Sequence, residues 1–356
     1  MPGWVELHTH SNHSFLDGAS EVDELVDAAV AQGMDALALT DTNGLYGAVR
    51  FANAAQDRGV RPIFGAELQL QDAGHVVLIA RDRQGWTSLC RTISAAQLAG
   101  EKTKPRATLA LLSENAAGLF ALTACKWGAV PHAVRAGDID GAREALARFA
   151  AVFGERLYVE LSDHLDPEDA PLCDTLASLA AEVGLGCVVT NNVHYARPEG
   201  RRLHDVLRCI DLGVTLDEAG NRLKPNGEYW LKGEVMLRDR LGRFDEAFRN
   251  ARAIADACVF ELLPGVGGAE AGGRDATASF VGKDRLPGFP VPEGDTAFSF
   301  LYALCQEGAR AKYPRITRGP EITSSPSSPA GTSRPASSAT LASRGGQTRP
   351  MGRVAF

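Results

Sequence analysis

The sequence contains no pair of cysteines in a CxxC spacing, and its seven cysteines are scattered and odd in number. A zinc ribbon and a framework of disulfides both need cysteines in pairs, so this distribution argues against either. Scattered, unpaired thiols are typical of a protein in a reducing compartment. We therefore expect a cytoplasmic protein.

Long apolar runs are also missing. No stretch approaches the about 20 apolar residues that cross a bilayer, and no secretory signal pattern precedes the first apolar run. We therefore expect no membrane contact.

An excess of positive charge is missing as well. With a net charge of −7 the chain as a whole does not attract nucleic acid electrostatically.

Histidine is scarce, with eight in 356 residues, yet three of them lie in ELHTHSNHSFLDG. Residues 5–8 are predicted to form a strand, and alternate residues of a strand point to the same side. His8 and His10 would then face one cavity, joined by Asp17 from the following loop. Two imidazoles and a carboxylate suit Zn, Mn or Fe. The alternative is a polar strand end with solvated histidines, and His13 is best explained as an exposed loop residue.

Short apolar or β-branched runs alternate with helical patterns along the chain. Strands are predicted at residues 5–8, 36–40, 62–66, 75–80, 119–123, 157–161 and 187–190. Helices are predicted at residues 21–32, 45–58, 85–98, 140–153, 167–183 and 198–212. This alternation predicts an α/β fold with a parallel sheet and helical crossovers, closed as a barrel or left open.

Polar side chains follow most of the predicted strands. They are His8 and His10, Asp41 and Thr42, Glu67, Cys125, Asp163 and His164, and Asn192 and His194. Functional groups of barrels gather at the C-terminal ends of the strands, so this recurrence favours a metal cavity there. His75 fits less well, because it opens its strand. Asp138 and Asp140 in GDIDG are interpreted as a helix cap, and His132 and His204 as surface or packing residues of helices.

The composition changes beyond about residue 213. LKPNGEYWLKGEVM is polar and rich in turns, helices are predicted at 244–260 and 298–313, and residues 265–274 read as a Gly-rich inserted loop. From residue 316 the chain consists mainly of Ser, Pro, Gly, Ala, Thr and Arg, with Glu321 as the one acid. Such a segment buries too little apolar surface to order itself. It is either a disordered tail or the translation of a shifted reading frame.

Six segments, in this order, resemble the PHP domain (polymerase and histidinol phosphatase): ELHTHSNHSFLDGAS, ALALTDTNGLYGAVRF, PIFGAEL, HVVLIARD, ALTACKWG and VVTNNVHYARP. The version is the one at the N-terminus of bacterial C-family DNA polymerases, the DNA polymerase III α chains, and is most similar to their error-prone branch. The resemblance covers about residues 4–315. It implies a PHP-type (β/α)7 barrel at residues 1–212, a mostly helical start of the polymerase region at 213–315, and the tail at 316–356.

The resemblance also implies a divalent metal, Zn, Mn or Fe, in the barrel. The implied ligands are His8, His10, Asp17, Glu67, His75, Cys125 and His194. Thr42 stands where the family has a histidine, and Asn192 where it has an aspartate. The loss of an imidazole and of a charge argues against full hydrolytic activity, and the site is expected to bind either one structural metal or none. Cys125 is either a thiolate ligand or a small buried apolar residue.

For function, the resemblance implies the N-terminal fragment of an error-prone DNA polymerase that acts in damage tolerance and repair. The implied partners are DNA and other replication or mutagenesis proteins. The Mg²⁺-binding aspartates of the polymerase are expected outside this chain, so we expect it neither to extend a primer nor to bind DNA tightly. The alternatives are a stand-alone PHP phosphoesterase acting on a phosphate ester or a DNA 3′ end, a replicative DNA polymerase III α fragment, and a non-catalytic binding module.

Overall fold

The computed structural model describes residues 3–263 and 290–313. They belong to two units, with the division between Asp284 and Arg285. The first unit contains the sheet and all the candidate ligands. In the second unit the described residues contain helix α12 (Ala297–Lys312), which confirms the helix predicted at 298–313. The predicted Gly-rich loop at 265–274 and the tail from residue 316 lie outside the described residues.

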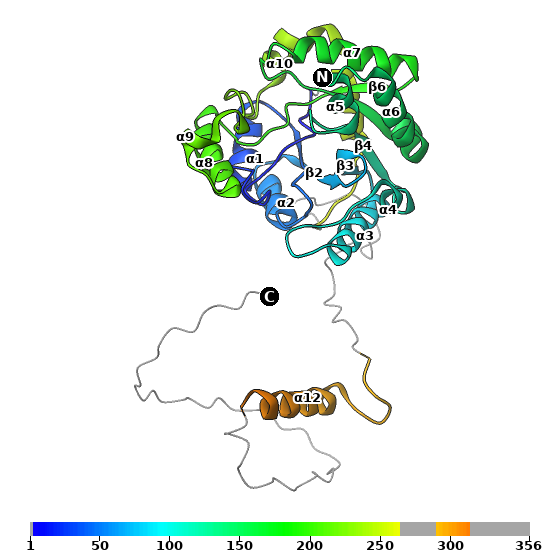
Figure 1. Cartoon of the computed structure of the whole chain (residues 1–356), viewed down its shortest axis with the longest axis vertical. Coiled ribbons are helices and arrows are strands. Elements are labelled where there is room, and N and C mark those ends of the chain that lie inside the picture. The colour runs from blue at the N-terminus through cyan, green and yellow to red at the C-terminus, as the bar shows by residue number, and fades with distance from the viewer. Residues whose placement is uncertain (1–2, 264–289, 314–356) are drawn as a thin grey trace. The chain divides into compact units, whose positions relative to one another are not determined.

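Six strands form one curled sheet in which their order follows the chain (Figure 1). The strands are β1 (Ala36–Leu39), β2 (Arg61–Leu70), β3 (Gly74–Ala80), β4 (Leu119–Leu122), β5 (Leu157–Leu161) and β6 (Gly186–Val189). Their short, apolar, β-branched or alanine-rich sequences are buried on both faces, as in other α/β sheets. Neighbouring strands are parallel, except that β3 runs antiparallel to β2 and to β4.

The reversal of β3 departs from the predicted parallel sheet. Only residues 71–73 join β2 to β3, which is far too short for a crossover, so the two strands form a hairpin. Gly74 has a φ of +65°, and a Cβ there would lie 2.6 Å from the carbonyl oxygen of Trp127. Because β3 is reversed, its first residues lie at the same edge of the sheet as the last residues of the parallel strands.

The N-terminal segment closes the sheet into a barrel, as the predicted (β/α)7 fold requires. The amides of Ala38 and Thr40 donate to the carbonyls of Glu6 and Thr9, and His10 N–H donates to Val193, beyond β6. The prediction of a regular strand at residues 5–8 is wrong, because the segment forms one isolated bridge, at Thr9. Side chains occupy its other amides: Glu6 accepts from the N–H of His8, and Thr40 from that of Thr9.

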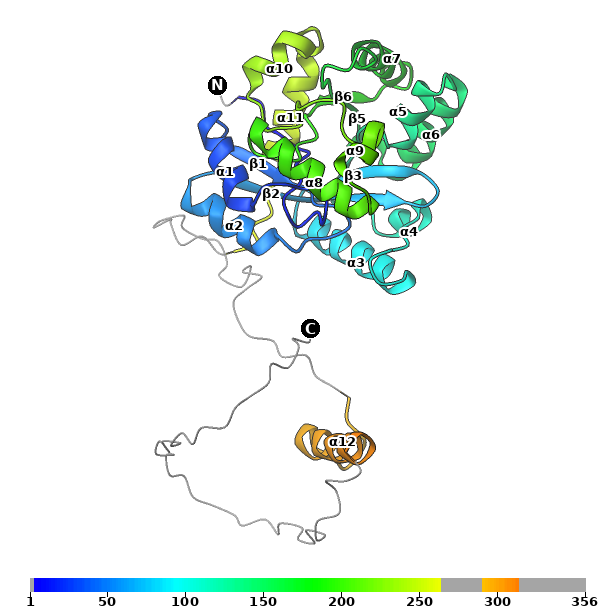
Figure 2. The ribbon, with the colours of Figure 1, turned by 60° about the vertical axis from the view of Figure 1, so that its left-hand side comes forward.

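Helices surround the sheet (Figure 2). They are α1 (Val22–Ala31), α2 (Ala48–Asp57), α3 (Arg83–Ala99), α4 (Leu109–Glu114), α5 (Ala129–Arg135), α6 (Ile139–Phe153), α7 (Asp169–Glu182), α8 (Arg201–Leu212), α9 (Leu216–Ala219), α10 (Glu234–Leu241) and α11 (Asp245–Ala257). All the helices predicted up to residue 263 are present, with ends shifted by a few residues. The GDIDG interpretation is also confirmed: Asp138 caps α6 by accepting from Gly141 N–H.

Helix α11 packs on the barrel beside β6. Its buried Phe248 contacts Trp4, with ring centroids 6.3 Å apart, and Asn250 donates to the carbonyl of Cys187 at 2.8 Å. Arg61 of β2 donates to the carbonyls of Ala255 and Cys258 at the end of α11. Residues 231–262 thus contribute side chains to the hydrophobic core of the barrel. Among residues 3–263 and 290–313, no helix combines the length and apolar composition needed to cross a bilayer.

Candidate metal centre

All seven predicted ligands lie at the edge of the sheet where the parallel strands end. His8 and His10 come from the N-terminal segment, and Glu67 from β2. His75, which fitted the sequence pattern less well, reaches the same edge because β3 is reversed. Most of the set lines one cavity of about 610 Å³, whose wall includes Asp17, Glu67, His75, Cys125 and His194.

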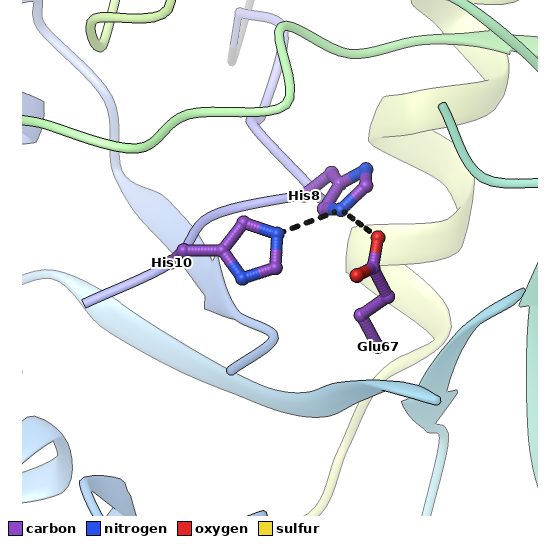
Figure 3. A group of neighbouring side chains, drawn as sticks. All are labelled: His8, His10 and Glu67. Carbon is purple, nitrogen blue, oxygen red and sulfur yellow. Dashed lines mark hydrogen bonds and ion pairs between the residues drawn. The ribbon is translucent and has the colours of Figure 1, made fainter. Parts of the chain in front are cut away.

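His8, His10 and Glu67 form the first cluster, and their ligand atoms lie within 4.8 Å of one another (Figure 3). His8 Nε2 is 3.1 Å from His10 Nε2 and 3.2 Å from Glu67 Oε2. All three side chains are buried. Two imidazole nitrogens and a carboxylate oxygen aimed at one point are a donor set that suits Zn, Mn or Fe.

The outer ring nitrogens of this cluster are held by buried polar groups. His8 Nδ1 donates to Glu160 Oε1 at 2.7 Å. Glu160 also accepts from Thr190 Oγ1, and Ser14 Oγ lies 3.0 Å from His10 Nδ1. A carboxylate that orients the far side of an imidazole is the usual outer support of a metal-binding histidine. The arrangement leaves Nε2 of both rings facing each other, with Glu67 beside that of His8.

Glu67, His75 and Cys125 form a second cluster that shares Glu67 with the first. Glu67 Oε1 is 3.0 Å from His75 Nδ1, while its other oxygen faces His8. Cys125 is buried beside them, with burial raising the pKa of its thiol. One carboxylate therefore faces two groups of donors, as in sites that hold neighbouring cations.

Asp17, His194 and His204 form a third cluster. Asp17 Oδ2 is 3.4 Å from His194 Nδ1, and Asp17 Oδ1 is 3.7 Å from His204 Nε2. The rings of His10 and His194 stack at 4.7 Å, so this cluster adjoins the first. His194 and His204 are buried, and none of their four ring nitrogens has a hydrogen-bond partner within the described part of the chain. Buried nitrogens without a hydrogen-bond partner carry a desolvation cost that binding a cation would remove.

The carboxylates control the protonation of the first cluster. Burial would lower the pKa of His8, but Glu160 and Glu67 outweigh it and raise this pKa to about 10. Burial would likewise raise the pKa of Glu67, but hydrogen bonds from His75 and His8 hold it well below its ordinary value. Without a metal, an imidazolium therefore lies between two carboxylates. Burial lowers the pKa of His10 and His194, which leaves their lone pairs free for a cation.

The two positions that depart from the family pattern have different surroundings. Thr42 Oγ1 lies 3.3 Å from His10 Nδ1, the outer nitrogen of that ring, and belongs to none of the three clusters. Asn192 lines the cavity, and its buried Oδ1 has no hydrogen-bond partner among residues 3–263 and 290–313. Thr42 therefore supports a ligand from outside, whereas Asn192 still offers an oxygen to the cavity.

Sequence reasoning missed Glu160 and His204. Glu160 is an acid inside the apolar strand LYVEL, an anomaly that could have drawn attention to it. His204 was interpreted as a surface or packing residue, but it is buried and faces Asp17. His164 is also buried, where its Nε2 bonds to the carbonyl of Asn191. His13 is half-buried and His132 exposed, and neither joins a cluster of the described residues.

Glu160→Gln should weaken metal binding about 10–100-fold, the usual cost of losing an outer support of a metal-binding histidine. The substitution keeps the shape of the side chain but removes the charge that faces His8 Nδ1. Competition with a chromogenic chelator measures the affinity. Glu155→Gln, at an exposed glutamate nearby, is the control. Equal affinities for the two variants would mean that Glu160 does not support the site.

Comparisons with known proteins give matches in sequence and in structure. Residues 6–164 match the PHP domain. The error-prone DNA polymerase of Symbiobacterium thermophilum is 36% identical over an alignment length of 333, and the alignment covers 88% of this chain and 29% of that protein. For the error-prone DNA polymerase of Mycobacterium tuberculosis, identity is 39% over an alignment length of 324, which covers 87% of this chain and 28% of that protein.

The DNA polymerase III subunit alpha of Thermus aquaticus is 33% identical over an alignment length of 335, which covers 88% of this chain and 26% of that protein. Among solved structures, an amidohydrolase from Chromobacterium violaceum aligns with a TM-score of 0.40 at 19% identity, covering 53% of this chain and 87% of that one. The chain spans less than a third of the length of the curated relatives it matches. It contains a PHP domain and is a homologue of the bacterial error-prone DNA polymerases and DNA polymerase III α subunits.

Proposed function

We propose that this chain is the PHP-containing part of an error-prone DNA polymerase and that its barrel holds divalent cations. For the whole polymerase we propose Mg²⁺-dependent DNA synthesis in damage tolerance and repair, with DNA and other replication or mutagenesis proteins as partners. The described residues from 213 onward would be the start of its polymerase region. A cytoplasmic location is part of the proposal, since all seven cysteines are unpaired.

One observation carries the metal part of the proposal: the convergence of three donor clusters on the same edge of the barrel. His8, His10 and Glu67 would hold one cation, and Glu67, His75 and Cys125 would help to hold a second. Imidazole, carboxylate and thiol donors suit Zn, Mn or Fe better than Mg. A bound cation would act as a Lewis acid or would stabilise the barrel. The residues of this chain supply the donors, fix their orientation and exclude water behind them.

Zinc binding at pH 7.5 should release about one proton from the first cluster, because His8 has a pKa of about 10 and must lose the proton on Nε2 to bind a cation. A second proton should appear if Cys125 binds as a thiolate, since its pKa is also raised. Calorimetry in two buffers with different ionisation enthalpies counts these protons, and elemental analysis counts the metal.

His132→Gln should leave the proton count unchanged, and Cys125→Ala should reduce it by one if the thiolate is a ligand. A purified chain that retains no Zn²⁺, Mn²⁺ or Fe²⁺ after loading and dialysis would refute the metal platform.

A second candidate is a PHP-type phosphoesterase acting on a phosphate ester or a DNA 3′ end. It is favoured by the cations on the wall of the cavity, which are Lys126, Arg135, Arg208, Arg222 and Lys224. The ammonium groups of Lys126 and Lys224 lie over the rings of Trp127 and Tyr229. Thr42 and Asn192 argue against this candidate. Hydrolysis of p-nitrophenyl phosphate with Mn²⁺, abolished by Glu67→Gln, would support it.

A further inference from the structure

We propose that His204 is a metal ligand that completes, with Asp17 and His194, a separate cation site in the barrel. The inference rests on the proposed function, because it adds a site to the same metal platform. His204 lies outside the ligand set that the family resemblance implies. Its helix, α8, follows β6 and extends over the cavity edge, which brings an imidazole from a different element into the centre.

The geometry of the cluster suits a cation. One ligand atom from each of the three residues lies within 4.8 Å of the others. The two imidazoles meet edge to face, with centroids 5.4 Å apart, and Asp17 faces a nitrogen of each. Two imidazole nitrogens and one carboxylate oxygen are the donor set of many Zn, Mn and Fe(II) sites. No lysine or arginine nitrogen of the described residues lies within 4 Å of Asp17.

A purely structural role does not account for the burial of the two imidazoles. His204 is 1% exposed and His194 4% exposed, and their nitrogens have no hydrogen-bond partner among the described residues. Each unpaired buried polar group lowers the stability of the fold by about 1–3 kcal/mol. If the two imidazoles had only a structural role, this cost would remain uncompensated. A cation shared by both rings and by Asp17 would remove it.

Local structure holds His204 in place. Gly200 precedes α8, and a Cβ at this position would lie 2.5 Å from Cβ of Tyr195, so glycine lets the helix start close to the barrel. Tyr195 in turn packs against the His204 ring, with centroids 5.9 Å apart. Asp205 Oδ1 lies 3.6 Å from His204 Nδ1, on the side away from Asp17. A carboxylate on the far side of the ring parallels the pairing of Glu160 with His8.

His204 also compensates for a loss. Thr42 stands where the resemblance expects a histidine, and its hydroxyl is turned to the outer nitrogen of His10. Without His204, the implied ligand set leaves Asp17 and His194 as a pair with one carboxylate and one imidazole. With His204 the pair becomes a three-ligand site. The chain would then bind one more cation than the implied ligand set predicts.

Cobalt and zinc binding to the full 356-residue chain test the proposal. His204→Gln should lose one Co²⁺ equivalent, or the affinity of that equivalent should fall at least about 100-fold, more than the loss of an outer support costs. Asp17→Asn should lose the same equivalent, and the double variant should lose no more than either single one. His204→Asp, which restores a ligand atom, should recover it. His132→Gln, at an exposed helical histidine, is the matched control.

His10→Gln distinguishes a failure of the metal platform from a failure of the His204 assignment. It should remove a different equivalent, so His10→Gln with His204→Gln should lose two. If the unaltered chain binds no cation, the metal platform itself fails. If the chain binds cations and His204→Gln binds as many with the same affinity, only the assignment of His204 is overturned.

If His204→Gln fails to fold, an NMR spectrum of the unaltered chain tests whether His204 is a ligand. With ¹¹³Cd²⁺ and ¹⁵N-labelled histidine, five coupled imidazoles are expected: His8, His10, His75, His194 and His204. Absence of ¹¹³Cd coupling at the assigned His204 resonance would overturn the assignment of His204 as a ligand.

Discussion

Glu67→Gln is expected to remove cations from two of the three clusters at once. Its two carboxylate oxygens face different groups, one 3.2 Å from His8 Nε2 and the other 3.0 Å from His75 Nδ1. When the free cation concentration is about 1,000 times the Kd, binding at one site raises the free energy of unfolding by about 4 kcal/mol. The variant should lose this stabilisation at each affected site. Thermal unfolding with Zn²⁺ and with EDTA measures it. Glu144→Gln, at an exposed glutamate of α6, is the control.

The same substitution should change the pH dependence of the metal-free protein. The lowered pKa of Glu67 contributes stability above its ordinary value of 4.5, which is lost as the pH falls below it. The raised pKa of His8 contributes stability that is complete below 6.5 and is lost as the pH rises towards about 10. This pair therefore stabilises the metal-free barrel most between pH 4.5 and 6.5. A Glu67→Gln profile identical to that of the unaltered chain would contradict the pairing.

Phe248→Ala is expected to destabilise the barrel by about 3–5 kcal/mol, the usual cost of removing a buried phenyl ring. The side chain is 2% exposed, packs on Trp4 and lies under the guanidinium of Arg238 at 4.3 Å. Because total stabilities are about 5–15 kcal/mol, a large part of the stability would be lost. Urea unfolding, followed by tryptophan fluorescence and by circular dichroism, measures the change.

Phe298→Ala is the matched control, because this phenylalanine of α12 is 78% exposed. Its effect should stay within about 0.5 kcal/mol, as for other surface substitutions. A small effect of Phe248→Ala would mean that α11 unfolds separately and that the cooperative unit ends before it. The proposed boundary at residue 212 would then also be a boundary in stability.

Local patterns in the sequence were enough to predict most of the fold. The alternation of apolar runs with helical periods identifies every strand of the sheet and most of its helices, because both periods are short-range properties. The reversal of β3 was not foreseen, although the three residues between β2 and β3 exclude a crossover. The irregular first segment was missed because its amides bond to side chains instead of to a neighbouring strand: His8 N–H donates to Glu6 and Thr9 N–H to Thr40, and neither bond leaves a periodic pattern in the sequence.

The site was predictable wherever a ligand follows directly from a strand end. His8 and His10 share a side because they are two residues apart, and Glu67 and His194 follow the strands predicted at residues 62–66 and 187–190. His204 could not be found in this way. A histidine in a helix joins a metal centre only if the helix packs with that face towards the cavity, and this depends on contacts such as Gly200 with Tyr195. Glu160 likewise acts on His8 across 152 positions of sequence.

The closure of the barrel by its N-terminal segment has a consequence for folding. His8 and His10 are synthesised early, but their segment contacts Val189 and Val193, about 185 residues later in the chain. For example, Trp4 Nε1 donates to the carbonyl of Val189. Contacts so distant in sequence close slowly, because the entropy of a long loop must be lost before they form. During synthesis, His8 and His10 would therefore have no formed metal site until β6 leaves the ribosome. Stable cation uptake would then mark the completion of the barrel and follow every earlier step of its folding.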